Sequence, residues 1–262
     1  MKGRPSPVFG DGNRLMGAVV ITGGSRGIGA ATAVLAAQYG WDVSLGYRAD
    51  AQAAAVVAAE CRKHGVSAVT VPVDVSREAD VVRLFETTHH ELGPITALVN
   101  NAGIVAGRST VADLDAARIE RLLAVNVLGA FLCAREAVRR MAVSRGGAGG
   151  SIVNVSSRAA VLGSAGEYVD YAASKAAVEA MTTGLALEVA ADGIRVNAVR
   201  PGLIDTEIHA GGGQPDRVER LSGSVPMRRG GRADEVAEAI VWLMSPLASY
   251  TTGAFLDVSG GR

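Results

Sequence analysis

The feature that most constrains the fold is a repeated alternation of short, continuously apolar runs with longer helical segments. A run such as Ala18-Val19-Val20-Ile21-Thr22 is typical of a strand buried on both faces. Strands that alternate with helices over short connections predict a parallel, right-handed, doubly wound sheet. The expected strands are residues 18–22, 43–47, 68–73, 97–99, 152–155, 194–199 and 254–258. The sequence therefore predicts one α/β domain over residues 17–262, with helices on both faces of the sheet.

Two of the segments between these runs are unusual. Residues 115–142 are helical but are interrupted by Asn126-Val127-Leu128-Gly129, and an asparagine inside a helix marks a kink or a buried hydrogen bond. Residues 203–232 are polar and punctuated by glycine over a length that is more often functional than structural. We expect this segment to form a short helical lid over the site, mobile when the site is empty. Ser76 is expected to cap the helix that runs to about Leu92.

Composition excludes several classes of function. The chain has 262 residues, of which 48% are apolar and 20% charged, as in a soluble globular protein. Its 26 basic and 26 acidic residues balance, so no field attracts a nucleic acid. No apolar run reaches the roughly 18 residues of a membrane span, and the two cysteines and four histidines lack metal-binding spacings. We expect a cytoplasmic protein with a small-molecule substrate and no metal, preceded by a disordered leader over residues 1–16.

A glycine-rich stretch, Gly23-Gly24-Ser25-Arg26-Gly27-Ile28-Gly29, follows the first strand and opens a helix. Such a turn directs backbone N–H groups and the positive end of a helix toward one point, which suits a phosphate group. A tight turn without a ligand is the alternative for an isolated motif of this kind. The strand before it and the helix after it favour a dinucleotide site.

The end of the second strand indicates which dinucleotide is bound. Many such sites place an acid there to hold the ribose diol of the adenosine, whereas this chain has Tyr47-Arg48. An arginine binds a 2′-phosphate through charge-assisted hydrogen bonds, and Arg26 in the glycine stretch is placed to close on the same phosphate. The sequence therefore favours NADP over NAD, although Arg48 also fits an ordinary solvated loop.

A candidate catalytic group follows the fifth strand. Tyr171 and Lys175 are four residues apart in a helical segment, so they share one face of the helix. A nearby cation favours the phenolate and is expected to lower the pKa of Tyr171. Ser157 stands at the carboxyl end of the fifth strand, before a loop over residues 158–168, and is expected to join them; Ser156 remains an alternative.

Taken together, the motifs resemble those of the short-chain dehydrogenase/reductase family. The motifs in chain order are Thr22-Gly23-x3-Gly27-x-Gly29, Asn100-Asn101-Ala102-Gly103, Asn126, Ser157, Tyr171-x3-Lys175 and Pro201-Gly202. The resemblance covers residues 17–262 and is strongest to bacterial 3-oxoacyl-carrier-protein reductase-like and glucose dehydrogenase-like members. It implies a seven-stranded Rossmann-type sheet, hydride transfer between a nicotinamide and a carbonyl/alcohol pair, and a homotetramer.

The resemblance also implies a role for each matching residue. Tyr171 would be the general acid/base, Ser157 would hold the substrate oxygen, Lys175 would lower the pKa of the tyrosine, and Asn126 would position a relay water. Gly23, Gly27 and Gly29 would hold the pyrophosphate, Asp74 and Val75 would meet the adenine, and Ile204 and Thr206 the carboxamide. The implied cofactor-binding residues are Gly23, Ser25, Arg26, Gly27, Ile28, Gly29, Tyr47, Arg48, Asp74, Val75, Asn101, Ala102, Gly103, Tyr171, Lys175, Pro201, Gly202, Ile204 and Thr206.

The substrate is left open at this stage. The loop between Ser157 and Tyr171 carries Glu167-Tyr168-Val169-Asp170 and is one residue longer than in the acyl reductases, which argues against transferring their substrate. The expected activity is reduction of a 3-oxoacyl-type or other small carbonyl, with a glucose-type sugar dehydrogenase as the alternative. A dinucleotide-sensing protein without catalytic activity is the alternative from another class.

Overall fold

The computed structural model describes residues 16–262, so the leader expected over residues 1–16 falls, apart from Met16, outside the described residues. Seven strands form one sheet: β1 Ala18–Thr22, β2 Asp42–Tyr47, β3 Ala68–Pro72, β4 Ile95–Asn100, β5 Gly150–Val155, β6 Ile194–Pro201 and β7 Phe255–Val258. Every neighbouring pair is parallel, and the order is β3-β2-β1-β4-β5-β6-β7. The predicted Rossmann-type, doubly wound sheet is confirmed.

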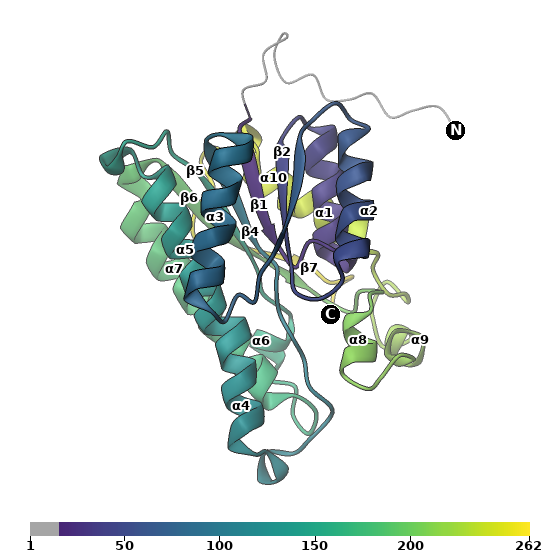
Figure 1. Ribbon diagram of the computed structural model, residues 1–262. Helices are drawn as coiled ribbons and strands as arrows, with labels where there is room; N and C mark the ends of the chain where they lie inside the picture. The colour runs from purple at the N-terminus through teal and green to yellow at the C-terminus, as the bar shows by residue number, and fades with distance from the viewer. Residues whose placement is uncertain (1–15) are drawn as a thin grey trace.

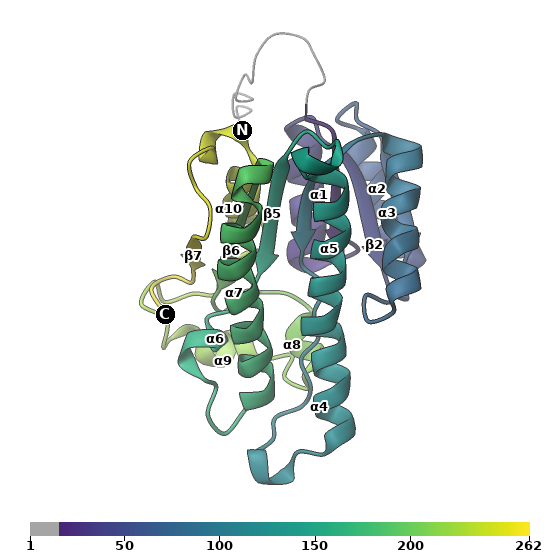
Figure 2. The ribbon, with the colours of Figure 1, turned by 90° about the vertical axis from the view of Figure 1, so that its left-hand side faces the viewer.

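Helices cover both faces of the sheet (Figures 1 and 2). One layer consists of α1 Gly27–Gln38, α2 Ala51–Arg62 and α10 Ala233–Met244, and the other of α3 Glu78–Leu92, α5 Gly129–Met141 and α7 Val169–Val189. Single-turn segments complete the connections: η1 Val111–Asp113, η3 Val143–Arg145, η4 Ala190–Asp192 and η5 Pro246–Ala248. None of the helices within residues 16–262 is long and apolar enough to cross a membrane.

Strand β1 shows why its continuous apolar run was informative. All five of its residues are buried, and successive side chains point to opposite faces. Val19 and Ile21 pack in the core cluster under α1 and α10, while Ala18 and Val20 pack in the cluster under α3 and α5. A polar residue at any of the four positions Ala18 to Ile21 would face one of these two cores, which is why that run is continuously apolar.

The order of the strands places a crevice at the carboxyl edge of the sheet. After β3 the chain returns across the sheet and places β4 on the other side of β1, so the direction of strand order reverses between β1 and β4. Ligands in doubly wound sheets bind beyond the carboxyl ends of the strands at this reversal. Four further helices lie beyond that edge: α4 Ala116–Leu123, α6 Ala159–Leu162, α8 Ile208–Gly211 and α9 Arg217–Ser222 (Figure 1).

The structure refines three local expectations. The interruption at Asn126 is a turn of π-helix, η2 Ala124–Leu128, between α4 and α5. The loop expected over residues 158–168 contains the short helix α6. Ser76 does not cap α3, which begins at Glu78 after Arg77; its hydroxyl instead donates to Asp74 Oδ1 at 2.6 Å. The short side chains of Asp74 and Ser76 close a local turn, and this bond competes with capping.

Candidate active site

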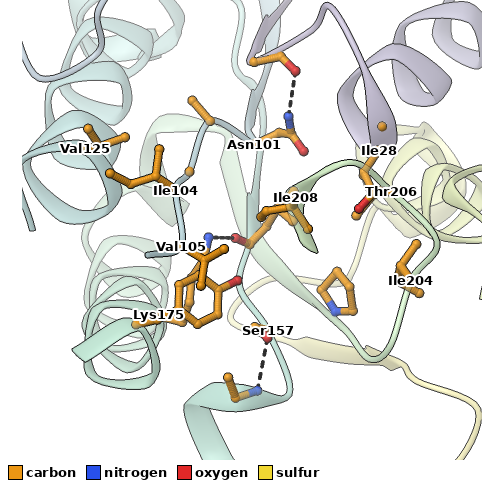
Figure 3. A pocket seen from close by; sticks show the side chains of 18 of the residues that line it. Ile28, Asn101, Ile104, Val105, Val125, Ser157, Lys175, Ile204, Thr206 and Ile208 are labelled. Carbon is orange, nitrogen blue, oxygen red and sulfur yellow. Dashed lines mark hydrogen bonds between the residues drawn. The ribbon is translucent and has the colours of Figure 1, made fainter. Parts of the chain in front are cut away.

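A pocket of about 950 Å³ lies at the carboxyl edge of the sheet, between the glycine turn after β1 and the segments that follow β4, β5 and β6. Figure 3 shows Ser157 and Lys175 on one side of this pocket and Ile28, Ile204 and Thr206 on the other. Every site residue expected from the sequence lines the pocket except Gly29 and Asn126. These two lie directly behind lining residues, as described below.

The glycine turn is shaped by close backbone contacts that only glycine permits. Gly23 and Gly27 have positive φ angles of 66° and 54°, a region that side chains disfavour. A Cβ on Gly29 would lie 2.3 Å from the carbonyl oxygen of Gly23, so a side chain there would push the turn apart. Helix α1 then begins at Gly27, with no acidic residue in its first turn and no side-chain cap from Arg26. This end of the helix therefore fits a phosphate group.

Asn101 fastens the glycine turn to the end of β4. Its side-chain amide donates to the carbonyl oxygen of Thr22 at 2.9 Å and to that of Gly23 at 3.0 Å, the second of which Figure 3 draws. The Thr22 hydroxyl in turn accepts from the backbone N–H groups of Asn101 and Ala102 at 3.1 and 3.0 Å. These bonds hold the turn in shape, so its N–H groups keep a fixed direction.

The expected catalytic residues meet at the end of β5. Tyr171, in the first turns of α7, lies beside Ser157, whose hydroxyl acts to lower the pKa of the phenol and accepts from the backbone N–H of Ala159 at 3.1 Å. Lys175 Nζ lies 5.7 Å from the centre of the Tyr171 ring and donates to the carbonyl oxygen of Val155 at 2.7 Å. Strand β5, α6 and α7 therefore place a hydroxyl, a phenol and an ammonium group in one pocket.

The two serines that the sequence left open differ in their contacts. Ser156 also lines the pocket, but it is buried and its hydroxyl donates to Glu179 Oε1 at 2.8 Å. Glu179 is held in turn by Arg200, with Nε–Oε1 and Nη2–Oε2 distances of 2.7 and 2.8 Å. Ser157 is the serine that contacts Tyr171, and Ser156 belongs to a supporting network.

The pKa of Tyr171 differs from the expectation. Burial raises the pKa of the phenol above its ordinary value, and the hydrogen bond with Ser157 only partly opposes this effect. Burial also lowers the pKa of Lys175 from 10.5 to about 8. The predicted lowering of the tyrosine pKa is therefore wrong for the protein's own groups, because loss of hydration outweighs the opposing effect of the Ser157 hydroxyl.

Asn126 organises the backbone beside the catalytic residues. Its side-chain oxygen accepts from the N–H of Ile104 at 2.8 Å, and its amide donates to the carbonyl of Ile104 and the hydroxyl of Ser174, both at 3.0 Å. Gly103 separates it from Lys175: a Cβ there would lie 3.4 Å from Asn126 Oδ1 and 3.3 Å from Lys175 Nζ. The sequence allowed either a kink or a buried hydrogen bond at this residue, and the structure shows the buried hydrogen bonds.

The far end of the pocket contains an arginine that the sequence did not indicate. Asp74 lies between Arg48, with an Nε–Oδ2 distance of 3.6 Å, and Arg121 of α4, with an Nη1–Oδ2 distance of 3.5 Å. Burial tends to raise the pKa of Asp74, but hydrogen bonds from Ser76 and the two arginine charges hold it below the usual value. Arg121 Nη2 is buried without a hydrogen-bond partner. Arg121 was missed because its spacing on α4 matches an ordinary solvated helix.

Another unpredicted group lies at the opposite end. Glu167, Tyr168 and Arg217 line the pocket beside Leu162 and Ile208, and they connect the segment before Tyr171 with α9. The sequence contained one indication of this group, the run Glu167–Asp170, because it lies in a loop that is one residue longer than in the acyl reductases. Arg217, fifty residues further along, carries no signal of its own. No cluster of three or more metal-ligating side chains occurs in the part of the chain that the structure describes.

Comparison with known proteins agrees with this geometry. A family model described as enoyl-(acyl carrier protein) reductase matches residues 23–262. The chain is 56% identical over 247 residues to the uncharacterized oxidoreductase YgfF of Escherichia coli K12, covering 94% of this chain and 100% of that protein. It is 40% identical over 242 residues to the cis-4-hydroxycyclohexanecarboxylate dehydrogenase of Sinomonas cyclohexanicum, covering 92% and 94%.

Solved structures are similar over nearly the whole chain. A short-chain type dehydrogenase/reductase from Mycobacterium marinum superposes with a TM-score of 0.87 at 34% identity, covering 94% of each chain. A 3-ketoacyl-(acyl-carrier-protein) reductase from Brucella melitensis, complexed with NADH, gives a TM-score of 0.86 at 33% identity, covering 94% of this chain and 98% of that one.

Proposed function

The chain belongs to the short-chain dehydrogenase/reductase family of oxidoreductases, and from this premise we propose that it is an NADP(H)-dependent enzyme that interconverts a carbonyl and an alcohol through Ser157, Tyr171 and Lys175. The observation that supports this proposal best is that Ser157, Tyr171 and Lys175 come together in one pocket, with Lys175 Nζ 5.7 Å from the centre of the Tyr171 ring. All three line the same pocket as the glycine turn.

The chemistry follows from what these side chains hold. The bound nicotinamide supplies the hydride in reduction and accepts it in oxidation. In the direction of reduction, Ser157 donates a hydrogen bond to the carbonyl oxygen, and Tyr171 transfers its phenolic proton to that oxygen as charge develops there. The raised pKa of Tyr171 keeps the phenol protonated at neutral pH, which suits this direction. Lys175, whose Nζ lies 5.7 Å from the centre of the ring, is the cation beside the phenolate that remains.

NADP is the proposed cofactor because two arginines border the pocket where the second strand ends. Arg26 and Arg48 both line it, and both are exposed on the side where a 2′-phosphate would extend from the adenosine ribose. Asp74, the acid nearest to Arg48, is flanked by Arg48 and Arg121. The charge in this region is therefore positive overall, which suits a phosphate better than a bare ribose diol.

We propose a small, free carbonyl or alcohol as the substrate in preference to an acyl group on a carrier protein. Three arginines near the lid are the candidates for contact with an acidic carrier: Arg228, Arg229 and Arg232. Two of them are paired with acids, since Arg229 Nη2 lies 2.6 Å from Glu235 Oε1 and Arg232 Nε lies 2.9 Å from Asp234 Oδ1. Arg228 donates to the carbonyl oxygen of Gly223. A relative 34% identical over 242 residues is named glucose 1-dehydrogenase 2, so a sugar is the second candidate.

A substrate panel tests the proposal. Purified protein is supplied with NADPH and, separately, 3-oxoacyl thioesters, small ketones, quinones and ketosteroids, and with NADP⁺ and sugars or cyclic alcohols, while NADPH absorbance is followed. Tyr171→Phe should lower the rate about a hundredfold or more, the share of a general acid, and leave NADPH binding unchanged. Tight NADPH binding with no turnover on any member would instead favour the dinucleotide-sensing alternative.

We also propose a homotetramer. Large apolar side chains remain exposed on the layer that contains α5 and α7, including Leu128 at 48%, Phe131 at 50% and Leu187 at 81%. Exposed apolar groups that gather on one layer are typical of a surface that another copy covers. Light scattering coupled to size exclusion measures the mass directly, and a monomeric mass would refute the proposal.

A further inference from the structure

Three segments meet at the end of the pocket farthest from the glycine turn, and Glu167 joins them. Its carboxylate accepts from Arg217 of α9, with an Nη2–Oε2 distance of 2.6 Å, and lies 3.6 Å from Arg108 Nε. Its backbone carbonyl accepts from the N–H of Ser109 at 3.0 Å. The segment after β4, the segment before Tyr171 and the lid helix are therefore connected through one side chain.

Arg217 is the member of this group with the most restricted surroundings. Only 8% of the residue is exposed, and its guanidinium lies 5.1 Å from the centre of the Tyr168 ring. Gln214 accepts from Arg217 Nη1 at 3.3 Å and donates to the hydroxyl of Tyr168. A guanidinium fixed on an aromatic face and by two hydrogen bonds has lost most of its side-chain freedom, so it presents its remaining donors in a set direction.

Charge at this end of the pocket is not balanced. The carboxylate of Glu167 faces two arginines, Arg108 and Arg217. Arg220 and Asp216 form a separate, solvated pair outside the pocket, with an Nε–Oδ2 distance of 3.4 Å, and balance each other. One positive charge therefore remains. The neighbouring pocket walls are apolar, with Val105, Leu162 and Ala165 among the lining residues, so a charge here is poorly hydrated. Such a site attracts one negative charge carried on an apolar body.

We propose that Arg217 binds a carboxylate on the substrate, remote from the reacting carbon, so that the substrates of this enzyme are small oxo acids and the matching hydroxy acids. The inference rests on the proposed function and names its substrate class. In this arrangement Ser157 and Tyr171 hold the reacting oxygen, and the substrate carboxylate shares Arg217 with Glu167. A purely structural alternative exists, in which the ion pair of Glu167 and Arg217 only closes the lid.

Matched ketone pairs separate the two accounts. Levulinate is compared with its primary amide, and cyclohexanone bearing a carboxylate opposite the carbonyl is compared with the carboxamide of the same shape. We expect kcat/KM to favour each carboxylate by about tenfold or more, the value of one charge-assisted hydrogen bond, and mainly through KM. Equal values for the members of both pairs would overturn the proposal.

Two substitutions should act in opposite directions. Arg217→Met should abolish the preference for the carboxylate and spare the amide, whereas Glu167→Gln should increase the preference, because Arg217 loses its competing partner. Arg220→Met is the matched control: it removes an arginine that also donates to Gln214, at 2.5 Å, but does not line the pocket. We expect it to leave the preference within about twofold of wild type, since a solvated ion pair contributes little.

The lid-closing account predicts a different pattern. If Arg217→Met and Glu167→Gln both slow the amide and the carboxylate by the same factor, the pair is structural and the proposal fails. Calorimetric titration of each ketone into the protein saturated with NADPH supplies a readout that does not require turnover. If neither ketone is reduced, the proposed function fails for this class, while tighter binding of the carboxylate than of the amide still supports the role of Arg217 and equal binding refutes it.

Discussion

Arg118 and Asp170 form a nearly buried ion pair that joins α4 to the start of α7, one residue before Tyr171. Arg118 Nε lies 2.7 Å from Asp170 Oδ2, and the two side chains are 17% and 3% exposed. Arg118 also donates to the carbonyl of Gly107 at 2.6 Å, and Asp170 Oδ1 accepts from the backbone N–H of Tyr171 at 2.9 Å. The first turn of α7, and with it the position of the tyrosine, depends on this pair.

Asp170→Asn should lower both stability and turnover. The asparagine oxygen can still accept from the Tyr171 N–H, so the substitution removes the charge but keeps that bond. Leaving Arg118 unpaired should cost about 3 kcal/mol of unfolding free energy, measured by urea denaturation. The double variant Arg118→Met/Asp170→Leu should recover part of this loss. Wild-type stability in the single variant would show that the pair is dispensable.

Arg48→Ala should weaken the binding of NADPH much more than the binding of NADH. Loss of one charge-assisted contact with a 2′-phosphate is expected to raise the Kd of NADPH about tenfold or more, and that of NADH less than about twofold. Arg121→Met is the informative comparison, because Arg121 lies beside Asp74 rather than at the strand end and should weaken both cofactors alike. Quenching of protein fluorescence gives both constants. Equal losses in Arg48→Ala would argue against NADP.

Lys175 should destabilise the folded protein near neutral pH. Burial lowers its pKa from 10.5 to about 8, so between these values the folded state holds fewer protons at this residue than the unfolded state. Free energy of unfolding therefore rises with pH in this window, by about 3 kcal/mol in all, and the gain is lost as pH falls through the folded pKa.

The measurement is the stability of wild type minus that of Lys175→Met, determined by denaturant titration across this pH range. The difference should increase with pH. Lys63→Met serves as the control, since Lys63 is 68% exposed and paired with Glu60 on the surface. A flat difference for Lys175→Met would contradict the assigned burial of the ammonium group.

Gly29→Ala and Gly184→Ala should have opposite effects. A Cβ at position 29 would lie 2.3 Å from the Gly23 carbonyl and 2.6 Å from Asn101 Nδ2, so the variant should lose about 2 kcal/mol of stability and bind NADPH poorly. At position 184, in the interior of α7, a Cβ meets no atom within 4 Å. Gly184→Ala should gain about 0.5 to 1 kcal/mol, because alanine suits a helix better. Calorimetric melting compares the two directly.

Much of the fold follows from local spacing in the sequence, because strands buried on both faces leave an unmistakable run such as Ala18–Thr22. The gathering of Ser157, Tyr171 and Lys175 in one pocket follows as well, since Tyr171 and Lys175 are one helical turn apart and Ser157 follows the end of a strand. The sequence did not identify Arg121 and Arg217 as pocket residues, because an arginine on a short polar helix has the same sequence pattern whether it faces solvent or a pocket. The pKa of Tyr171 was misjudged because the sequence shows which charges are near but not how much water is lost.

The π-helical turn η2, Ala124–Leu128, sets the rotation of α4 about its axis relative to α5. A regular helix advances by about 100° per residue, and the π-turn takes up about one extra residue, so rewinding the same residues as regular α-helix would rotate α4 about its axis by about that angle relative to α5. Arg118 and Arg121 would then swing away from Asp170 and Asp74 together. The surplus residue thus fixes which face α4 presents beyond the sheet while α5 stays packed on it.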